Sequence, residues 1–111
     1  MFTLSAIKET VKGNGRRASL ICNFTEAKAP VIEFGNERDG CRHQQVNLAD
    51  HLDTLKKLPD GYAFTMGRES YNDVDLGESD DISRLHCYVV RDGERFKLYD
   101  CSLFGTAIIM G

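Results

Sequence analysis

The sequence predicts a mainly β fold, because apolar and polar residues alternate along several short stretches. Residues 18–24 place Leu20, Cys22 and Phe24 at every second position. Residues 62–66 repeat the pattern with two aromatic residues and a methionine. A period of two is typical of a strand with one buried face.

Further strands are predicted where short apolar runs lie between turn-forming residues. Leu85 to Val90 is apolar on both faces, as in an inner strand. Asp92-Gly93 is a strong hairpin signal between this strand and the next. The other predicted strands are 31–34, 74–76, 96–98 and a strand beginning at 107–110.

One helix interrupts this pattern at residues 47–58. Asn47 is a good N-cap, the leucines that follow it recur at helical spacing, and Pro59 stops the helix. Residues 3–12 fit either a helix or a strand, with a slight preference for the helix. Gly35 to Gly40 is predicted to be a turn-rich loop.

Length and composition predict a single ordinary domain. The chain has 111 residues, of which 41% are hydrophobic and 28% are charged. A formal net charge of −3 predicts no general attraction to nucleic acid or to an anionic membrane. The chain has no apolar run of membrane-spanning length and no signal-peptide layout at its start, so the expected location is intracellular, in the cytoplasm or nucleus.

The four cysteines are expected to be reduced thiols, since no secretory signal precedes them. No CxxC pair exists, so neither a metal site nor a cofactor is expected. Cys41 with His43 and His51 is the only local cluster of metal-binding residue types, and scattered residues explain it better.

Four short blocks in the last 50 residues carry the functional signal. Each block is weak alone, but their order and spacing together are specific. They are Gly67-Arg68, Asn72-Asp73, Ser83-Arg84-Leu85-His86, and Asp100-Cys101-Ser102 running into Gly105-Thr106.

Over about residues 62–111 these blocks resemble the forkhead-associated (FHA) domain, a β-sandwich family whose loops bind phosphothreonine peptides. The resemblance implies a two-sheet sandwich to which the helix at 47–58 is an addition. It implies phosphopeptide contacts from Arg68, Ser83, Arg84, Asn72 and Thr106. It also implies structural support of the site from Gly67, His86 and Gly105.

The chemistry of these residues suits a phosphorylated threonine, which brings nearly two negative charges and three acceptor oxygens. A guanidinium and a hydroxyl held on rigid loops are good partners for such a group. Arg68 follows one predicted strand and Ser83 precedes another. In a sandwich the ends of such strands gather at one rim.

The sequence departs from the family pattern after Asp100. Leu103 and Phe104 stand where the family has a small polar residue and then an asparagine that holds the peptide main chain. Phe104 cannot donate those hydrogen bonds. The departure predicts that the contacts to phosphate are intact and that the contacts to the peptide backbone are damaged.

The chain also stops about two strands before the family pattern ends. Residues 1–60 are expected to be an extension packed on a core of residues 61–111. Either the sequence is a piece of a longer protein, or the missing strands come from residues 18–34 or from another chain. The last case makes a second copy or a strand-completing protein an expected partner.

These observations predict a binding module in signalling rather than an enzyme. No residue beside His86 stands at a spacing that would make a catalytic triad. The expected partner is a phosphothreonine-containing protein or peptide. The alternative is a degenerate FHA domain that serves as a phosphate-independent scaffold or oligomerisation interface.

Overall fold

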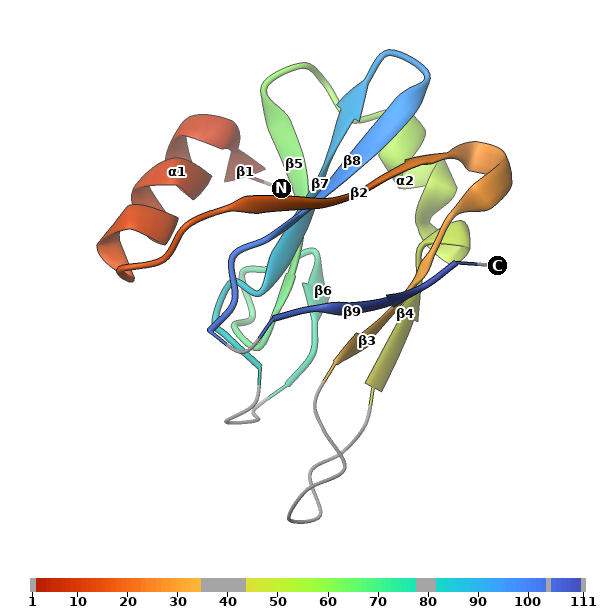
Figure 1. The fold of residues 1–111 in the computed structure, drawn as a ribbon. Coiled ribbons are helices and arrows are strands. Elements are labelled where there is room, and N and C mark those ends of the chain that lie inside the picture. Colours follow the sequence, from red (N-terminus) through yellow and green to blue (C-terminus); the bar gives the residue numbers. More distant parts are fainter. Residues whose placement is uncertain (1, 35–43, 78–81, 104, 111) are drawn as a thin grey trace.

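The computed structural model describes residues 2–34, 44–77, 82–103 and 105–110, and it confirms a mainly β fold with two sheets (Figure 1). The strands are β1 (Phe2–Thr3), β2 (Ser19–Thr25), β3 (Val31–Phe34), β4 (Gln44–Asn47), β5 (Tyr62–Gly67), β6 (Val74–Asp75), β7 (Cys87–Asp92), β8 (Arg95–Asp100) and β9 (Ala107–Ile109). The helices are α1 (Leu4–Gly13), α2 (Leu52–Lys56) and the 3₁₀ turns η1 (Glu26–Lys28) and η3 (Leu48–His51).

The larger sheet runs in the order β1-β5-β7-β8-β2, and its neighbours along that path are antiparallel. The short strand β6 pairs with β5 in parallel and lies off this path. The smaller sheet has the order β4-β3-β9, again antiparallel. The hairpin between β7 and β8 closes through Gly93, whose φ of 63° suits the turn.

The main core fills the space between the two sheets. Buried residues from the larger sheet, such as Met66 and Leu98, share one cluster with Ile32 and Phe34 of the smaller sheet. Leu48 and Leu55, from the η3–α2 segment, belong to the same cluster and are fully buried. Apolar burial of this kind is the main stabilising term of a two-layer fold.

A second core lies on the opposite face of the larger sheet, beneath α1. Ile7 and Val11 stand four residues apart on this helix and are buried against Ala63 and Tyr88. Thr3 caps the helix by accepting a hydrogen bond from the Ala6 N–H at 3.2 Å. The helix that the sequence slightly favoured at residues 3–12 is therefore present.

The N-terminal third of the chain supplies strands to both sheets. β2 pairs with β8, with Phe24 opposite Phe96, and β3 pairs with β9, with Ile32 opposite Ile108. Residues 18–34 thus pair with strands of the matched motif region, and their replacement of the family's last strands stays a prediction. The boundary predicted between residues 60 and 61 stays a prediction, and the strand pairings cross it.

The helix predicted at 47–58 forms in two parts, the 3₁₀ turn η3 followed by α2. The Asn47 side chain caps η3 by accepting from the Ala49 N–H at 3.0 Å. His51, between the two parts, has a φ of −114° and a ψ of 9°, which interrupts regular α-helix. The apolar stripe is buried as predicted, so packing holds the segment although its backbone geometry changes.

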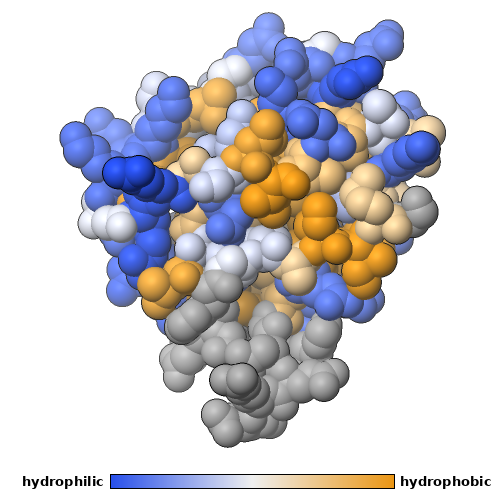
Figure 2. All heavy atoms as spheres, in the orientation of Figure 1, coloured by the Kyte–Doolittle hydropathy of each residue, from blue (hydrophilic) through white to orange (hydrophobic). Residues whose placement is uncertain are grey.

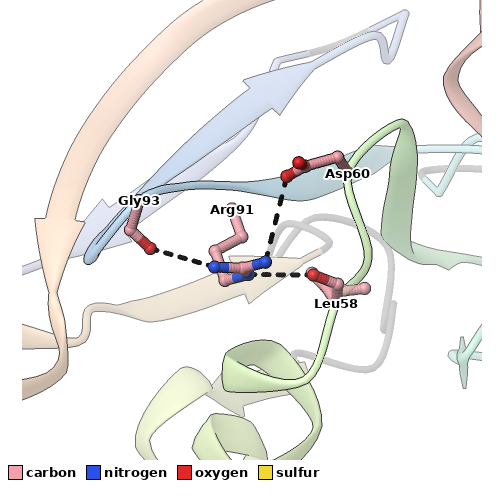
Figure 3. A network of polar contacts seen from close by, with 4 residues as sticks. All are labelled: Leu58, Asp60, Arg91 and Gly93. Atoms are coloured by element: carbon pink, nitrogen blue, oxygen red, sulfur yellow. Dashed lines mark hydrogen bonds and ion pairs between the residues drawn. The ribbon is translucent and has the colours of Figure 1, made fainter.

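Arg91 fastens the connection between α2 and β5 to the β7–β8 hairpin (Figure 3). Its Nε donates to the Leu58 carbonyl at 2.8 Å and a terminal nitrogen donates to the Gly93 carbonyl at 3.3 Å. A second terminal nitrogen lies 3.9 Å from the Asp60 carboxylate. These contacts lie on the hairpin side of the sheet, away from the motif-bearing loops.

The predicted strands are all present, but the two-residue strand β1 and the strand β4 were not predicted. The β4 sequence, Gln44 to Asn47, is polar apart from Val46 and too short to display alternation. The loop predicted at Gly35 to Gly40 lies outside the described residues. In the described part of the chain, no helix has the length and apolar character needed to cross a membrane.

Candidate functional site

A hollow of about 290 Å³ lies at the rim where β5 ends and the segment before β7 begins. Arg68, Ser83 and Arg84 line it together, so the structure brings the three main predicted phosphate contacts to one place. The remaining lining residues are Asn14, Arg16, Ile82, Leu85, Cys101 and Leu103.

Backbone contacts fix the end of β5 against the segment that carries Ser83 and Arg84. The Arg68 N–H donates to the Ser83 carbonyl at 3.1 Å. Gly67 packs so closely here that an added Cβ would overlap the Arg84 carbonyl oxygen and lie 2.8 Å from the Asn72 side-chain nitrogen. Only glycine fits this crossing, which explains why the Gly67-Arg68 block begins with that residue.

Asn72 braces the same crossing from the loop after β5. Its buried side-chain NH₂ donates to the Glu69 carbonyl at 2.9 Å and to the Arg84 carbonyl at 2.7 Å. Asn72 does not line the hollow, and its side-chain oxygen is buried without a hydrogen-bond partner among the described residues. Its geometry is that of a loop brace; a direct contact with a peptide stays a prediction.

Ser83 is held at three points. Its carbonyl accepts from Arg68, its own N–H donates to Nδ1 of His86 at 3.1 Å, and its hydroxyl oxygen accepts from the Leu103 N–H at 3.1 Å. The hydroxyl proton is not used in any of these contacts, so it can be donated to a ligand.

His86 supports the site from below. Because Nδ1 accepts from Ser83, the proton of the neutral ring sits on Nε2, which donates to the Gly105 carbonyl at 3.1 Å. Burial lowers the pKa of His86 from its ordinary value, although the Gly105 hydrogen bond and the charge of Asp100 oppose this shift. His86 thus joins the Ser83 segment to the loop before β9 as a neutral ring.

Asp100 organises the loop that leads to β9. One oxygen, Oδ1, accepts from the hydroxyls of Ser102 and Thr106, each at 2.6 Å, and from the Ser102 N–H at 3.2 Å. Gly105, with a φ of 90°, donates its N–H to the Ser102 hydroxyl at 2.8 Å. Thr106 is committed to this network and does not line the hollow, so its predicted ligand contact stays a prediction.

The electrostatics of the hollow favour an anion. The Nε of Arg68 is buried and has no hydrogen-bond partner among the described residues. The pKa of Tyr71 is raised, mainly by burial and then by the charge of Glu69, and the charges of Arg84 and Arg68 oppose this rise. The exposed Tyr71 therefore shares the neighbourhood of both guanidinium groups.

Sequence reasoning missed two residues of this site. Asn14 and Arg16 lie in the connection between α1 and β2, and both line the hollow. Arg16 stands in a charged turn far from the motif blocks in sequence, where a solvent-facing role is the ordinary interpretation. No signal in the sequence alone places that turn beside Arg68, because the placement depends on how α1 packs on the larger sheet.

Some predicted features fall outside the described residues. Among them are Phe104, Cys41 and His43. Leu103 is described, and its side chain is exposed at the hollow.

Cys22, Cys87 and Cys101 are free buried thiols, and burial raises the pKa of Cys101 to about 12. Across the described ranges, no group of three or more His, Cys, Asp or Glu side chains is arranged to hold a metal ion.

Comparison with protein-family models gives a match to the FHA domain over residues 64–109. Comparison with curated proteins and with solved structures gave no significant match. The matched residues run from β5 to β9 and include all four motif blocks. Residues 64–109 therefore match part of the FHA domain, a β-sandwich family whose members act generally as phosphopeptide-binding protein interaction modules.

Proposed function

We propose that this chain binds a phosphothreonine-containing segment of a partner protein, with Arg68 and Ser83 as the phosphate anchors. The observation that carries the proposal is that both residues line one hollow with Arg84, although they come from separate loops. The guanidinium can donate charge-assisted hydrogen bonds to a dianion, and the hydroxyl adds one more donor.

The rigidity of the site supports this proposal. Gly67, Asn72 and His86 hold the two anchor loops together through backbone and side-chain contacts that use no ligand-facing group of Arg68 or Ser83. The donors are therefore largely positioned before a ligand arrives, which reduces the entropy lost on binding.

The proposal makes the chain a binding module rather than an enzyme. His86 is the only imidazole beside the hollow in the described residues, and both of its nitrogens are bonded to backbone groups. A ring used in this way is a poor general base for a bound substrate.

Calorimetric titration of a phosphothreonine peptide and its unmodified twin tests the proposal. A peptide library identifies the sequence first. Each hydrogen bond to a charged group contributes about 1.5–3 kcal/mol, so Arg68→Ala should weaken binding roughly tenfold to a hundredfold or more. Ser83→Ala should also weaken it. Arg95→Ala is the matched control, because Arg95 is exposed and lines a different hollow.

Equal binding of the unmodified twin, or full affinity in Arg68→Ala, would rule out the phosphate clamp. A phosphoserine peptide provides a further comparison. A preference for phosphothreonine over phosphoserine would indicate a pocket for the extra methyl group, and equal binding would limit the function to phosphopeptide recognition in general.

A second candidate is a phosphate-independent scaffold or oligomerisation interface. Figure 2 shows apolar residues gathered on the face crossed by the edge strands β2 and β9. Leu20, Ile109 and Met110 are each close to half exposed, and Cys22 Sγ lies 3.8 Å from Met110 Sδ, which places the two edges together. Exposed apolar side chains on unpaired strand edges favour association.

Light scattering over a concentration series distinguishes the two candidates. Self-association that Ile109→Lys abolishes, together with no phosphopeptide binding, would favour the scaffold. If the protein is a monomer at all concentrations and binds the phosphopeptide, only the first candidate function remains.

A further inference from the structure

The hollow lined by Arg68, Ser83 and Arg84, called the phosphate hollow from here on, adjoins a second, basic hollow beside the N-terminal helix α1. This neighbour has a volume of about 410 Å³. Arg16 lines both hollows, so they meet at its side chain. The other lining residues of the second hollow are Lys8, Val11, Lys12, Arg17, Ala18 and Tyr88.

The position of Arg16 is fixed by the way α1 ends. Gly15 adopts a φ of 69° immediately after the helix, and its N–H donates to the Lys12 carbonyl at 3.0 Å. The Arg16 N–H then donates to the Val11 carbonyl at 2.9 Å. A glycine in the left-handed region followed by a bond back into the helix is a well-defined end, so the direction of the chain at Arg16 is set.

The charges of the second hollow are all of one sign. Lys8 and Lys12 stand one helical turn apart, and Arg16 and Arg17 follow the helix. No acidic residue lines either hollow. None of these four cations takes part in an ion pair within the described part of the chain.

An acidic stretch follows Arg68 in the sequence. Glu69, Asp73 and Asp75 are the described members of the acidic stretch after Arg68, and none of them lines either hollow. As carboxylates in the loops flanking the site, they predict a preference for basic residues near the phosphothreonine. The two effects are compatible when they act on opposite flanks of the peptide.

We propose that the segment from Lys8 to Arg17 forms an anionic subsite beside the phosphate hollow. The preferred ligand then carries a second negatively charged group, a carboxylate or another phosphate, a few residues to one side of its phosphothreonine. This inference rests on the proposed function and specifies the partner class for the same site.

The ordinary role of exposed lysines is to keep a helix solvated, and two features set this cluster apart. Arg16 is only partly exposed and joins the phosphate hollow, so its charge acts within the site. Val11 and Tyr88 give the second hollow an apolar floor, along which the lysine stems can lie with their ammonium groups outward.

Fluorescence polarisation with four labelled peptides tests this subsite. All share one phosphothreonine core and differ only in the flanks, which are neutral, acidic before the phosphothreonine, acidic after it, or neutral with a second phosphothreonine. Each exposed ion pair contributes up to about 1 kcal/mol, which corresponds to a gain of up to about fivefold. We therefore expect one acidic peptide to bind a few-fold more tightly than the neutral one.

The variant Lys8→Gln/Lys12→Gln should remove most of that gain while binding the neutral phosphopeptide as the wild type does. Lys28→Gln/Lys57→Gln is the matched control, since it removes two exposed lysines that line neither hollow. The gain should also shrink between 50 mM and 500 mM salt.

The outcomes separate this inference from the proposed function. Equal wild-type affinity for all four peptides at low salt would overturn the subsite and leave the phosphate clamp standing. If both double variants lose the affinity gain equally, the net charge of the protein, and not a subsite, would account for the gain. If the doubly phosphorylated peptide alone gains affinity, the subsite takes phosphate rather than carboxylate. Failure of every phosphopeptide to bind would remove the proposed function itself.

Discussion

The backbone N–H of Ser83 donates to Nδ1 of His86 at 3.1 Å, which ties the proposed phosphate anchor to a buried neutral imidazole. The other ring nitrogen donates to Gly105. One side chain thus holds together two loops that lie on opposite sides of β7 and β8 in the sequence. The ring can do this only while Nδ1 is unprotonated.

This relationship predicts that stability falls at acidic pH. Burial lowers the folded-state pKa of His86 below the ordinary value of 6.5, so the unfolded chain binds more protons there. Stability is then fully present above pH 6.5 and is lost as the pH falls below it, at no more than about 1.4 kcal/mol per pH unit. Urea unfolding at pH 7.5 and pH 5.5 measures the loss, and His86→Gln should reduce it. An unchanged pH dependence in the variant would assign the effect to other groups.

Gly67→Ala should destabilise the domain by about 1–3 kcal/mol, the usual range for overpacking. Its new Cβ would overlap the Arg84 carbonyl, and backbone cannot move as a flexible side chain does. Gly13→Ala is the control: nothing lies within 4 Å of its Cβ, and its place in α1 makes alanine neutral or favourable. Thermal unfolding of both variants checks the prediction. Equal unfolding temperatures for the two variants would mean that the backbone around Gly67 can move to accept a Cβ.

Asp100→Ala should loosen the loop before β9 and lower stability by about 2 kcal/mol, because three donors lose a charged acceptor. Thr106→Val removes only one of these bonds and should cost less, about 1 kcal/mol. Chemical denaturation gives both values. A greater loss in Thr106→Val than in Asp100→Ala would show that the threonine, rather than the carboxylate, is the centre of the network.

Binding of a phosphothreonine peptide should weaken as the pH falls below about 6, where the phosphate loses its second charge. The predicted change therefore comes from the ligand. Titration between pH 7.5 and pH 5.5 measures it, with a phosphonate analogue of different acidity as the comparison. If both ligands weaken at the same pH, a protein group and not the phosphate is responsible.

The parts of the fold that follow from local pattern were predicted from the sequence. The alternation in β2 and β5, the hairpin at Gly93 and the buried leucines of residues 48–55 all act over a few neighbours. The resemblance to the FHA family also pointed to Arg68 and Ser83, which the structure places in one hollow. β4 was missed because its four residues carry one apolar side chain.

Other features depend on contacts between distant residues, which a single sequence does not display. The contribution of Arg16 to the hollow requires that α1 pack on the larger sheet through Ile7 and Val11. The hydrogen bond from the Thr106 hydroxyl to Asp100 forms only because the loop between them brings the two side chains together. Residue type alone suits either a ligand contact or a loop brace, and only the fold distinguishes them.

The pairing of β3 with β9 has a consequence for biosynthesis. Val31 lies opposite Ile109, so two strands that are far apart in the sequence must meet before the smaller sheet is complete. On the ribosome, β2 and β3 emerge long before β8 and β9 and wait with unpaired edges. Contacts between residues so far apart in the sequence slow folding. The folding intermediates then expose apolar surface and unpaired strand edges that promote aggregation. Cooperative folding should therefore begin only after β9 has emerged.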